Sequence, residues 1–150
     1  PPMRYETVEV GDVSEFGSYE MTEAEIVEFA EKYDPQPFHT DPEAARETAF
    51  GELVASGWHT AAICMRMLAN GPLTERASMG ARGVDELRWR KPVKPGDTLH
   101  LRTEVLEKRV SESDPRRGYV NSRLEGVNQD GEVVISWIGL GMLEVRNPEN

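Results

Sequence analysis

The chain has 150 residues, of which 38% are hydrophobic and 29% are charged, and its formal net charge is −10 at neutral pH. This length suits one ordinary domain that buries a sizeable core without disulfides or metals. A strongly acidic chain is a poor match for nucleic acid, whose binding depends on Lys and Arg that neutralise phosphates. We therefore expect a single domain over residues 1–150 with no nucleic-acid partner, although local basic residues could still hold a small phosphorylated ligand.

Hydropathy and cysteine usage indicate the cellular location that we expect for the protein. No stretch approaches the roughly 18 consecutive apolar residues of a membrane-spanning helix, so we expect a soluble protein with no membrane partner. The first residues, Pro1 to Glu6, lack the apolar core of a signal peptide, and nothing in them suggests export. Cys64 is the single cysteine and lies in an apolar run, which predicts a small core residue rather than a nucleophile. A cytoplasmic, reducing setting fits these features best.

The first predicted elements are a short strand over residues 14–20 and a helix that runs to about Tyr33. The sequence Thr22-Glu23-Ala24-Glu25 has the form of a capping box, in which side chains satisfy exposed helix N–H groups. Asp34-Pro35 ends this helix, because the residue before a proline is pushed out of helical geometry. One face of the helix is apolar: Ile26, Phe29 and Ala30.

A proline-rich segment follows, with the sequence Pro35-Gln36-Pro37-Phe38-His39-Thr40-Asp41-Pro42. Its prolines predict a stiff loop with few backbone donors. Asp41-Pro42 has the residue types of an N-cap and a first helical position, so we expect a short helix over residues 42–48.

A second and longer helix is predicted from Ser56 to about Asn70. Its residues are apolar nearly all round, so we expect the helix to be buried. Gly71-Pro72 is expected to end it. The apolar positions are Trp58, Ala61, Ala62, Ile63, Cys64, Met65, Met67 and Leu68.

From residue 82 onward the hydrophobic period changes to two, which is typical of half-buried strands. Strands are predicted over 84–91, 98–109, 118–128 and 132–145, and a hairpin turn between the last two over 128–131. The final strand carries apolar residues on both faces, which predicts a central strand covered on both sides. The sequence thus predicts an α+β fold in which an antiparallel sheet wraps around a central buried helix.

His39 is the first candidate for chemistry, because two carboxylates lie near it. Asp34 precedes it by five residues and Asp41 follows it by two. A histidine and an aspartate on a rigid turn form a common acid/base pair, since histidine gains and loses a proton near neutral pH and proximity tunes the pKa of both groups. The same residue types also occur in plain loops, so this pattern alone leaves a structural role open.

The segment Ala55-Ser56-Gly57-Trp58 leads directly into the long helix. We expect the Gly57 N–H to be unpaired at the helix N-terminus, where it could stabilise an oxyanion. A glycine there would let a substrate carbonyl approach closely. Ser56 has the residue type of an N-cap, and both roles are compatible.

These segments carry a family resemblance. Residues 33–41, then Phe50-Gly51 and Ala55-Ser56-Gly57, resemble the signature of the MaoC-like acyl dehydratases, which include the (R)-specific enoyl-CoA hydratases. Residues 88–99 are similar to the strand-turn-strand that this family places after its central helix. The resemblance covers roughly residues 15–145 and implies a hot-dog fold.

The resemblance also implies roles for individual residues. Asp34 and His39 correspond to the catalytic pair, the Gly57 N–H to the oxyanion donor, and Ser56 to the serine of the active-site segment. We expect the substrate-binding contacts to come from Ser56, Phe38, Trp58 and Lys94. Gln36 departs from the pattern, because the hydratases of this family typically have asparagine there.

The implied reaction is reversible syn addition of water across a 2,3-enoyl thioester. It requires no metal or redox cofactor, and the expected partners are an acyl-CoA substrate and a second copy of the chain, giving a homodimer or a higher homo-oligomer. The carrier could be coenzyme A or acyl carrier protein, although an acidic surface disfavours an acidic carrier protein.

Two other functions compete with hydration. A hot-dog thioesterase usually needs a carboxylate on the central helix, and residues 57–70 contain no Asp or Glu. A non-catalytic acyl-binding subunit would be expected to lose the Asp/His pair, yet both residues are present.

Several residues keep two interpretations. The basic stretch could be a solvated sheet edge or could hold ligand phosphates; it contains Arg88, Arg90, Lys91 and Lys94. His59 could be a satisfied structural histidine or part of a pocket wall, and His100 is expected to face solvent. The three histidines are too dispersed to predict a metal site.

Overall fold

The computed structural model describes residues 4–75 and 77–146; Pro1 to Met3 of the N-terminal stretch lie outside the described residues. Five antiparallel strands form one sheet in the order β1-β3-β4-β5-β2. The strands are β1 (Val13–Glu20), β2 (Ser78–Trp89), β3 (Thr98–Val110), β4 (Arg117–Val127) and β5 (Val133–Glu144). The helices are α1 (Glu23–Tyr33), α2 (Pro37–Thr40), α3 (Pro42–Arg46), α4 (Gly57–Asn70) and α5 (Pro72–Glu75).

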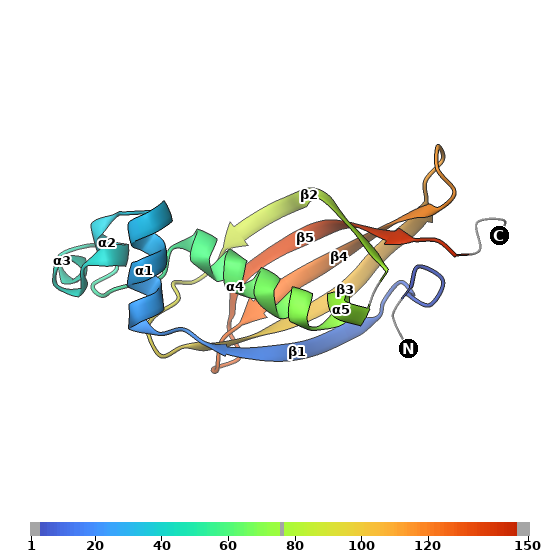
Figure 1. Cartoon of the computed structure of the whole chain (residues 1–150). Helices are drawn as coiled ribbons and strands as arrows, with labels where there is room; N and C mark the ends of the chain where they lie inside the picture. The colour runs from blue at the N-terminus through green and yellow to red at the C-terminus, as the bar shows by residue number, and fades with distance from the viewer. Residues whose placement is uncertain (1–3, 76, 147–150) are drawn as a thin grey trace.

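The long helix α4 lies along one face of the sheet, and α1, α2 and α3 gather at the end of the molecule where α4 begins (Figure 1). This arrangement confirms the predicted α+β hot-dog architecture, in which one sheet wraps around a central helix. No helix in the described part of the chain is long and apolar enough to cross a membrane.

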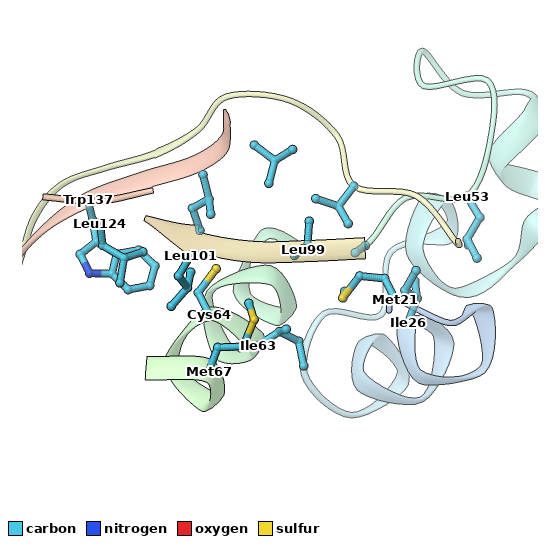
Figure 2. Packing of buried hydrophobic residues seen from close by; sticks show 14 of the residues in the cluster. Met21, Ile26, Leu53, Ile63, Cys64, Met67, Leu99, Leu101, Leu124 and Trp137 are labelled. Carbon is cyan, nitrogen blue, oxygen red and sulfur yellow. The ribbon is translucent and has the colours of Figure 1, made fainter. Parts of the chain in front are cut away.

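The core lies between α4 and the sheet. Figure 2 shows Cys64 and Met67 of α4 packed in one cluster with Leu101 of β3. Cys64 is fully buried, and this burial raises the pKa of its thiol to about 12. A thiol with so high a pKa is unreactive at neutral pH, which confirms the predicted core role.

The prediction that α4 is buried all round was wrong. Its inner face is buried, but Trp58 is 56% exposed and Met65 is 46% exposed. The sheet covers one face of the helix, and these two side chains lie on the other side, where about half of each is open to solvent. An exposed apolar face of this kind often marks a contact with another molecule.

The proline-rich segment is also not a plain loop. Pro37 begins the one-turn helix α2, a position where its missing N–H costs nothing. Asp41 then caps α3 by accepting N–H bonds from Glu43 and Ala44. This second helix ends at Arg46 rather than at residue 48, and His39 therefore lies on a helical turn.

Other boundaries differ where local signals were ambiguous. Pro72 begins the short helix α5 instead of only ending α4. β2 begins at Ser78 rather than at residue 84. The prediction missed this start, because Gly80 and Gly83 have positive φ angles and interrupt the side-chain alternation. His100 is half-buried rather than exposed, since β3 pairs with a strand on each side. β5 likewise lies between β4 and β2 and is an interior strand, as predicted.

Candidate active site

Asp34 occupies the C-cap of α1, where its own N–H donates to the Ala30 carbonyl at 2.8 Å. Both of its carboxylate oxygens accept hydrogen bonds. Oδ1 accepts one from Gln36 Nε2 at 2.6 Å, and Oδ2 accepts one from the Ser56 hydroxyl at 2.7 Å. Two fixed donors therefore hold this carboxylate in a single orientation.

The same contacts determine the ionisation of Asp34. Burial by itself would raise the pKa of this carboxyl, but the hydrogen bonds from Gln36 and Ser56 and the nearby His39 outweigh it and lower the pKa below its ordinary value. Asp34 is therefore a carboxylate at neutral pH. A carboxylate that is already held and ionised can accept a proton without further rearrangement.

His39 lies on α2 with its ring buried against the segment that leads into α4. Its Nδ1 lies 2.7 Å from the Val54 carbonyl oxygen, and its Nε2 lies 3.3 Å from Asp34 Oδ2. A carbonyl can only accept, so Nδ1 carries a hydrogen and Nε2 faces Asp34. The Phe38 ring packs edge-on against the imidazole at 4.6 Å between ring centroids.

Ser56 joins the first turn of α4 to Asp34. It is fully buried and caps the helix by accepting the Trp58 N–H at 3.3 Å, while its own hydrogen goes to Asp34. The N–H groups of His59 and Thr60 both donate to the Ser56 carbonyl. No acceptor in residues 4–75 and 77–146 takes the Gly57 N–H, which is therefore open at the N-terminus of α4.

Gly57 is required for a reason that the sequence did not suggest. A Cβ atom at this position would lie 2.3 Å from the indole of Trp89 at the end of β2. That indole also meets Trp58 edge-on, with 5.0 Å between ring centroids. The missing side chain of Gly57 thus makes room for Trp89, a residue that sequence reasoning missed. The available signal was an aromatic residue between two arginines of the basic stretch, Arg88 and Arg90.

These side chains line one open cavity of about 480 Å³. Asp34, His39, Gly57, Phe38 and Trp58 all contribute to its wall, and so does Trp89. Ser56 does not line the cavity, because its hydroxyl is turned inward to Asp34.

The basic stretch divides in the structure. Lys94 lies outside this cavity, half-exposed, with its Nζ 3.6 Å from a carboxylate oxygen of Glu52. Lys91 lines the cavity but forms an ion pair with Glu132. Arg90 also lines the cavity, and its Nε donates to the Ser136 hydroxyl at 2.7 Å.

His59 combines features of both interpretations. It is 3% exposed and stacks on Phe29 with 4.7 Å between ring centroids, while its Nδ1 has no hydrogen-bond partner in the described chain. It also borders a hollow beside α1, apart from the cavity that contains Asp34. Burial lowers its pKa, although Glu25 acts in the opposite direction.

Comparison with known proteins gives consistent matches. The family model described as MaoC like domain matches residues 7–126. A MaoC-like dehydratase from Rhodospirillum rubrum is 42% identical, and the match covers 96% of this chain and 98% of that one with a TM-score of 0.90. The 3-hydroxybutyryl-CoA dehydratase of Methylorubrum extorquens is 30% identical over 133 residues, which are 87% of this chain and 82% of that protein. The R-hydratase PhaJ1 from Pseudomonas aeruginosa is 28% identical, with coverage of 95% and 86% and a TM-score of 0.73.

Proposed function

The chain belongs to the MaoC-like dehydratase family, and we propose that it is a hydro-lyase of the (R)-specific enoyl-CoA hydratase type. It would reversibly add water to a 2,3-enoyl thioester and give a 3-hydroxyacyl thioester. The names of the relatives described above support hydration or dehydration as the general reaction class. The observation that carries the proposal is the 3.3 Å approach of His39 Nε2 to an Asp34 carboxylate that two donors hold ionised.

The first proposed step is the attack of water on C3. A water molecule beside Asp34 Oδ2 and His39 Nε2 would give a proton to the carboxylate while its oxygen bonds to C3. The π electrons of the C2–C3 bond then move toward the thioester carbonyl and form an enolate. Each acid/base group of this kind typically contributes roughly 10²–10⁴-fold to the rate.

The second proposed step is the collapse of the enolate. The open Gly57 N–H at the N-terminus of α4 would donate to the enolate oxygen, an interaction typically worth about 3–4 kcal/mol of barrier. C2 then takes a proton from the Asp34/His39 pair, so that H and OH add to the same face. Phe38 and Trp58 would contact the acyl group, and no step needs a metal or redox cofactor.

We propose coenzyme A as the carrier, because a chain with a net charge of −10 would repel an acidic carrier protein. In this proposal Ser56 positions Asp34 and does not touch substrate. The ion pair of Lys94 with Glu52 lowers the expectation that this lysine binds a carrier phosphate.

The direct test is loss of enoyl-thioester absorbance with crotonyl-CoA. We expect the wild type to hydrate this substrate, and Asp34→Asn and His39→Ala each to abolish detectable turnover. Asp41→Asn is the matched control, because it removes a neighbouring carboxylate outside the cavity and keeps a good N-cap for α3. It should retain wild-type activity.

The other outcomes separate the rival functions. Activity that survives in both Asp34→Asn and His39→Ala would rule out this mechanism. Release of free coenzyme A from crotonyl-CoA would indicate a thioesterase. Binding of acyl-CoA thioesters of several chain lengths without turnover would indicate a non-catalytic subunit.

We also propose that the protein is a homodimer in which two β2 strands pair. β2 is a 12-residue edge strand, and the unpaired backbone N–H and C=O groups of a long edge strand can pair with a strand of another chain. Val84 of β2 is 50% exposed and, with the exposed Met65 of α4, lines an apolar hollow of about 250 Å³. A second copy of the chain would cover the β2 edge, the exposed side chains of Val84 and Met65, and the apolar hollow in one symmetric contact.

Light scattering after gel filtration tests the dimer. We expect a mass of about twice 16.8 kDa for the wild type and a monomer for Val84→Asp. Val13→Asp is the matched control, since Val13 is 51% exposed on β1 at the opposite edge of the sheet. A monomeric wild type at micromolar concentration, or equal dissociation by both substitutions, would contradict the proposal.

A further inference from the structure

Two cationic side chains line the candidate active-site cavity, Arg90 and Lys91, and they differ in how their charge is used. Lys91 forms an ion pair with Glu132. Arg90 has no carboxylate within ion-pairing distance in residues 4–75 and 77–146. Its positive charge is therefore available to a ligand in the cavity.

Arg90 is also fixed in place by neutral groups. Its backbone N–H donates to the Val134 carbonyl at 2.8 Å, and its Nε donates to the Ser136 hydroxyl at 2.7 Å. Ser136 is buried on the interior strand β5. A hydroxyl orients the guanidinium without neutralising it, and the two terminal nitrogens keep their N–H donors.

A guanidinium held in this way has a specific chemical preference. Its planar fork presents two parallel N–H donors, which match the paired oxygens of a carboxylate or a phosphate. An anchored side chain loses less conformational entropy on binding than a free arginine would. The neighbouring Arg88 lacks this arrangement, because it donates to the adjacent Leu87 carbonyl and does not line the cavity.

We propose that Arg90 is a specificity-determining residue that binds an oxyanion of the bound thioester through its two terminal nitrogens. This assignment rests on the proposed function insofar as the ligand is an acyl-CoA thioester. The oxyanion has two possible sources, a second carboxylate at the far end of the acyl group or a phosphate of coenzyme A. The guanidinium geometry is the same for both, and a comparison of two ligands separates them.

The test measures binding alone, by calorimetry, with the saturated thioesters butyryl-CoA and glutaryl-CoA. Both lack the C2–C3 double bond and cannot be hydrated, and glutaryl-CoA carries the additional carboxylate. Arg90→Met is compared with Arg88→Met, which removes the same charge nearby but outside the cavity. A lost charge-assisted pair should weaken binding by about 10- to 100-fold.

Each outcome decides the assignment. If Arg90→Met weakens glutaryl-CoA alone, the oxyanion is the acyl carboxylate; if it weakens both ligands equally, the oxyanion is a coenzyme A phosphate. Arg90→Lys should recover only part of the loss, because it restores the charge without the fork. The assignment is overturned if Arg90→Met changes affinity no more than Arg88→Met, or if the folded wild type binds neither ligand.

Failure of the proposed hydration remains distinguishable from failure of this assignment. A wild type that binds these thioesters through Arg90 but does not hydrate crotonyl-CoA would keep the oxyanion site and exclude the hydratase. A wild type that hydrates crotonyl-CoA, with equal ligand affinities in the two arginine variants, would do the reverse.

Discussion

The two halves of α4 serve the molecule in different ways. The first turn depends on directed hydrogen bonds, since Ser56 caps the helix and donates to Asp34 at the C-cap of α1. The second half depends on packing, with Ile63, Cys64 and Met67 buried against the sheet. Hydrogen bonds fix orientation, whereas apolar burial supplies most of the stability.

The division of labour along α4 lets one helix hold a site open without losing its own stability. The N–H groups of the first turn have no intrahelical acceptors, so that end can leave the Gly57 N–H open. The buried second half keeps the axis of the helix fixed while the first turn contacts the cavity. A site positioned by a packed helix is more precisely held than one carried by loops alone.

Met67→Ala should have the largest effect on the packed second half of α4. Met67 is 6% exposed and fills the space beside Gly17, where a Cβ atom would lie 2.8 Å from its sulfur. Truncation leaves a cavity that Gly17 cannot fill, so we expect a loss of about 2–5 kcal/mol in the free energy of unfolding. Met65→Ala, on the exposed side of the same helix, should cost under about 0.5 kcal/mol in the monomer.

Urea denaturation of a monomeric background such as Val84→Asp measures both losses without interference from assembly. Equal losses for the two methionines would mean that the second half of α4 is not held by one-sided packing.

Gly57→Ala tests the first turn sterically. The new methyl group would overlap the Trp89 indole, and overpacking of this kind typically costs about 1–3 kcal/mol. Trp89 is 49% exposed, so we expect the indole to move rather than the helix to unfold. A double-mutant cycle with Trp89→Ala measures the coupling. If Gly57→Ala costs as much without the indole as with it, Trp89 is not the reason for the glycine.

Ser56→Ala tests the joint between the first turn and Asp34. Loss of the cap should cost about 1 kcal/mol, and Thr22→Ala, which removes the cap of α1 without touching the cavity, should cost the same. Loss of the hydrogen bond to Asp34 also removes an interaction that lowers the pKa of this carboxyl. The pKa of Asp34 should therefore rise in Ser56→Ala and stay unchanged in Thr22→Ala.

Two measurements check this prediction. The acid limb of kcat/KM should move to higher pH in Ser56→Ala alone, with about a tenfold loss of activity at neutral pH. Carboxyl NMR titration of Asp34 gives the same comparison without turnover. Unchanged titration in Ser56→Ala would show that the serine only caps the helix.

Local sequence signals were sufficient for most of the fold. The capping box at Thr22 and the prolyl residue after Asp34 act over a few positions, so both ends of α1 could be predicted. The long strands followed from a period of two. The segment before residue 84 could not be predicted, because its glycines adopt backbone angles that side-chain alternation does not reveal. The exposed face of α4 was missed because an apolar residue type does not show whether its own chain or another molecule covers the side chain.

The candidate site likewise has a part that local sequence could predict and a part that it could not. Asp34 and His39 are only five residues apart in the sequence, so they must lie near each other in space. Their proximity could therefore be predicted. The bonds that orient them are long-range: the Val54 carbonyl is 15 residues from His39, and Ser56 is 22 residues from Asp34. The contact of Arg90 with Ser136 spans 46 residues. Such pairs depend on the register of the sheet, which no single segment encodes.

The smallest predicted effect concerns His59, the polar residue of the first turn that faces away from the cavity. Burial lowers its pKa below the ordinary value of 6.5, against the opposing charge of Glu25, so the unfolded chain binds a proton more readily than the folded chain. The stability that depends on neutral His59 is complete above about pH 6.5 and is lost as the pH falls toward the folded pKa.

His59→Phe keeps a ring against Phe29 and sacrifices no hydrogen bond at Nδ1. The melting temperature of the wild type should therefore fall more steeply than that of His59→Phe between about pH 7 and 5. Parallel curves would mean that His59 accepts a proton without cost in the folded chain, and that the first turn of α4 is open to water on this side as well.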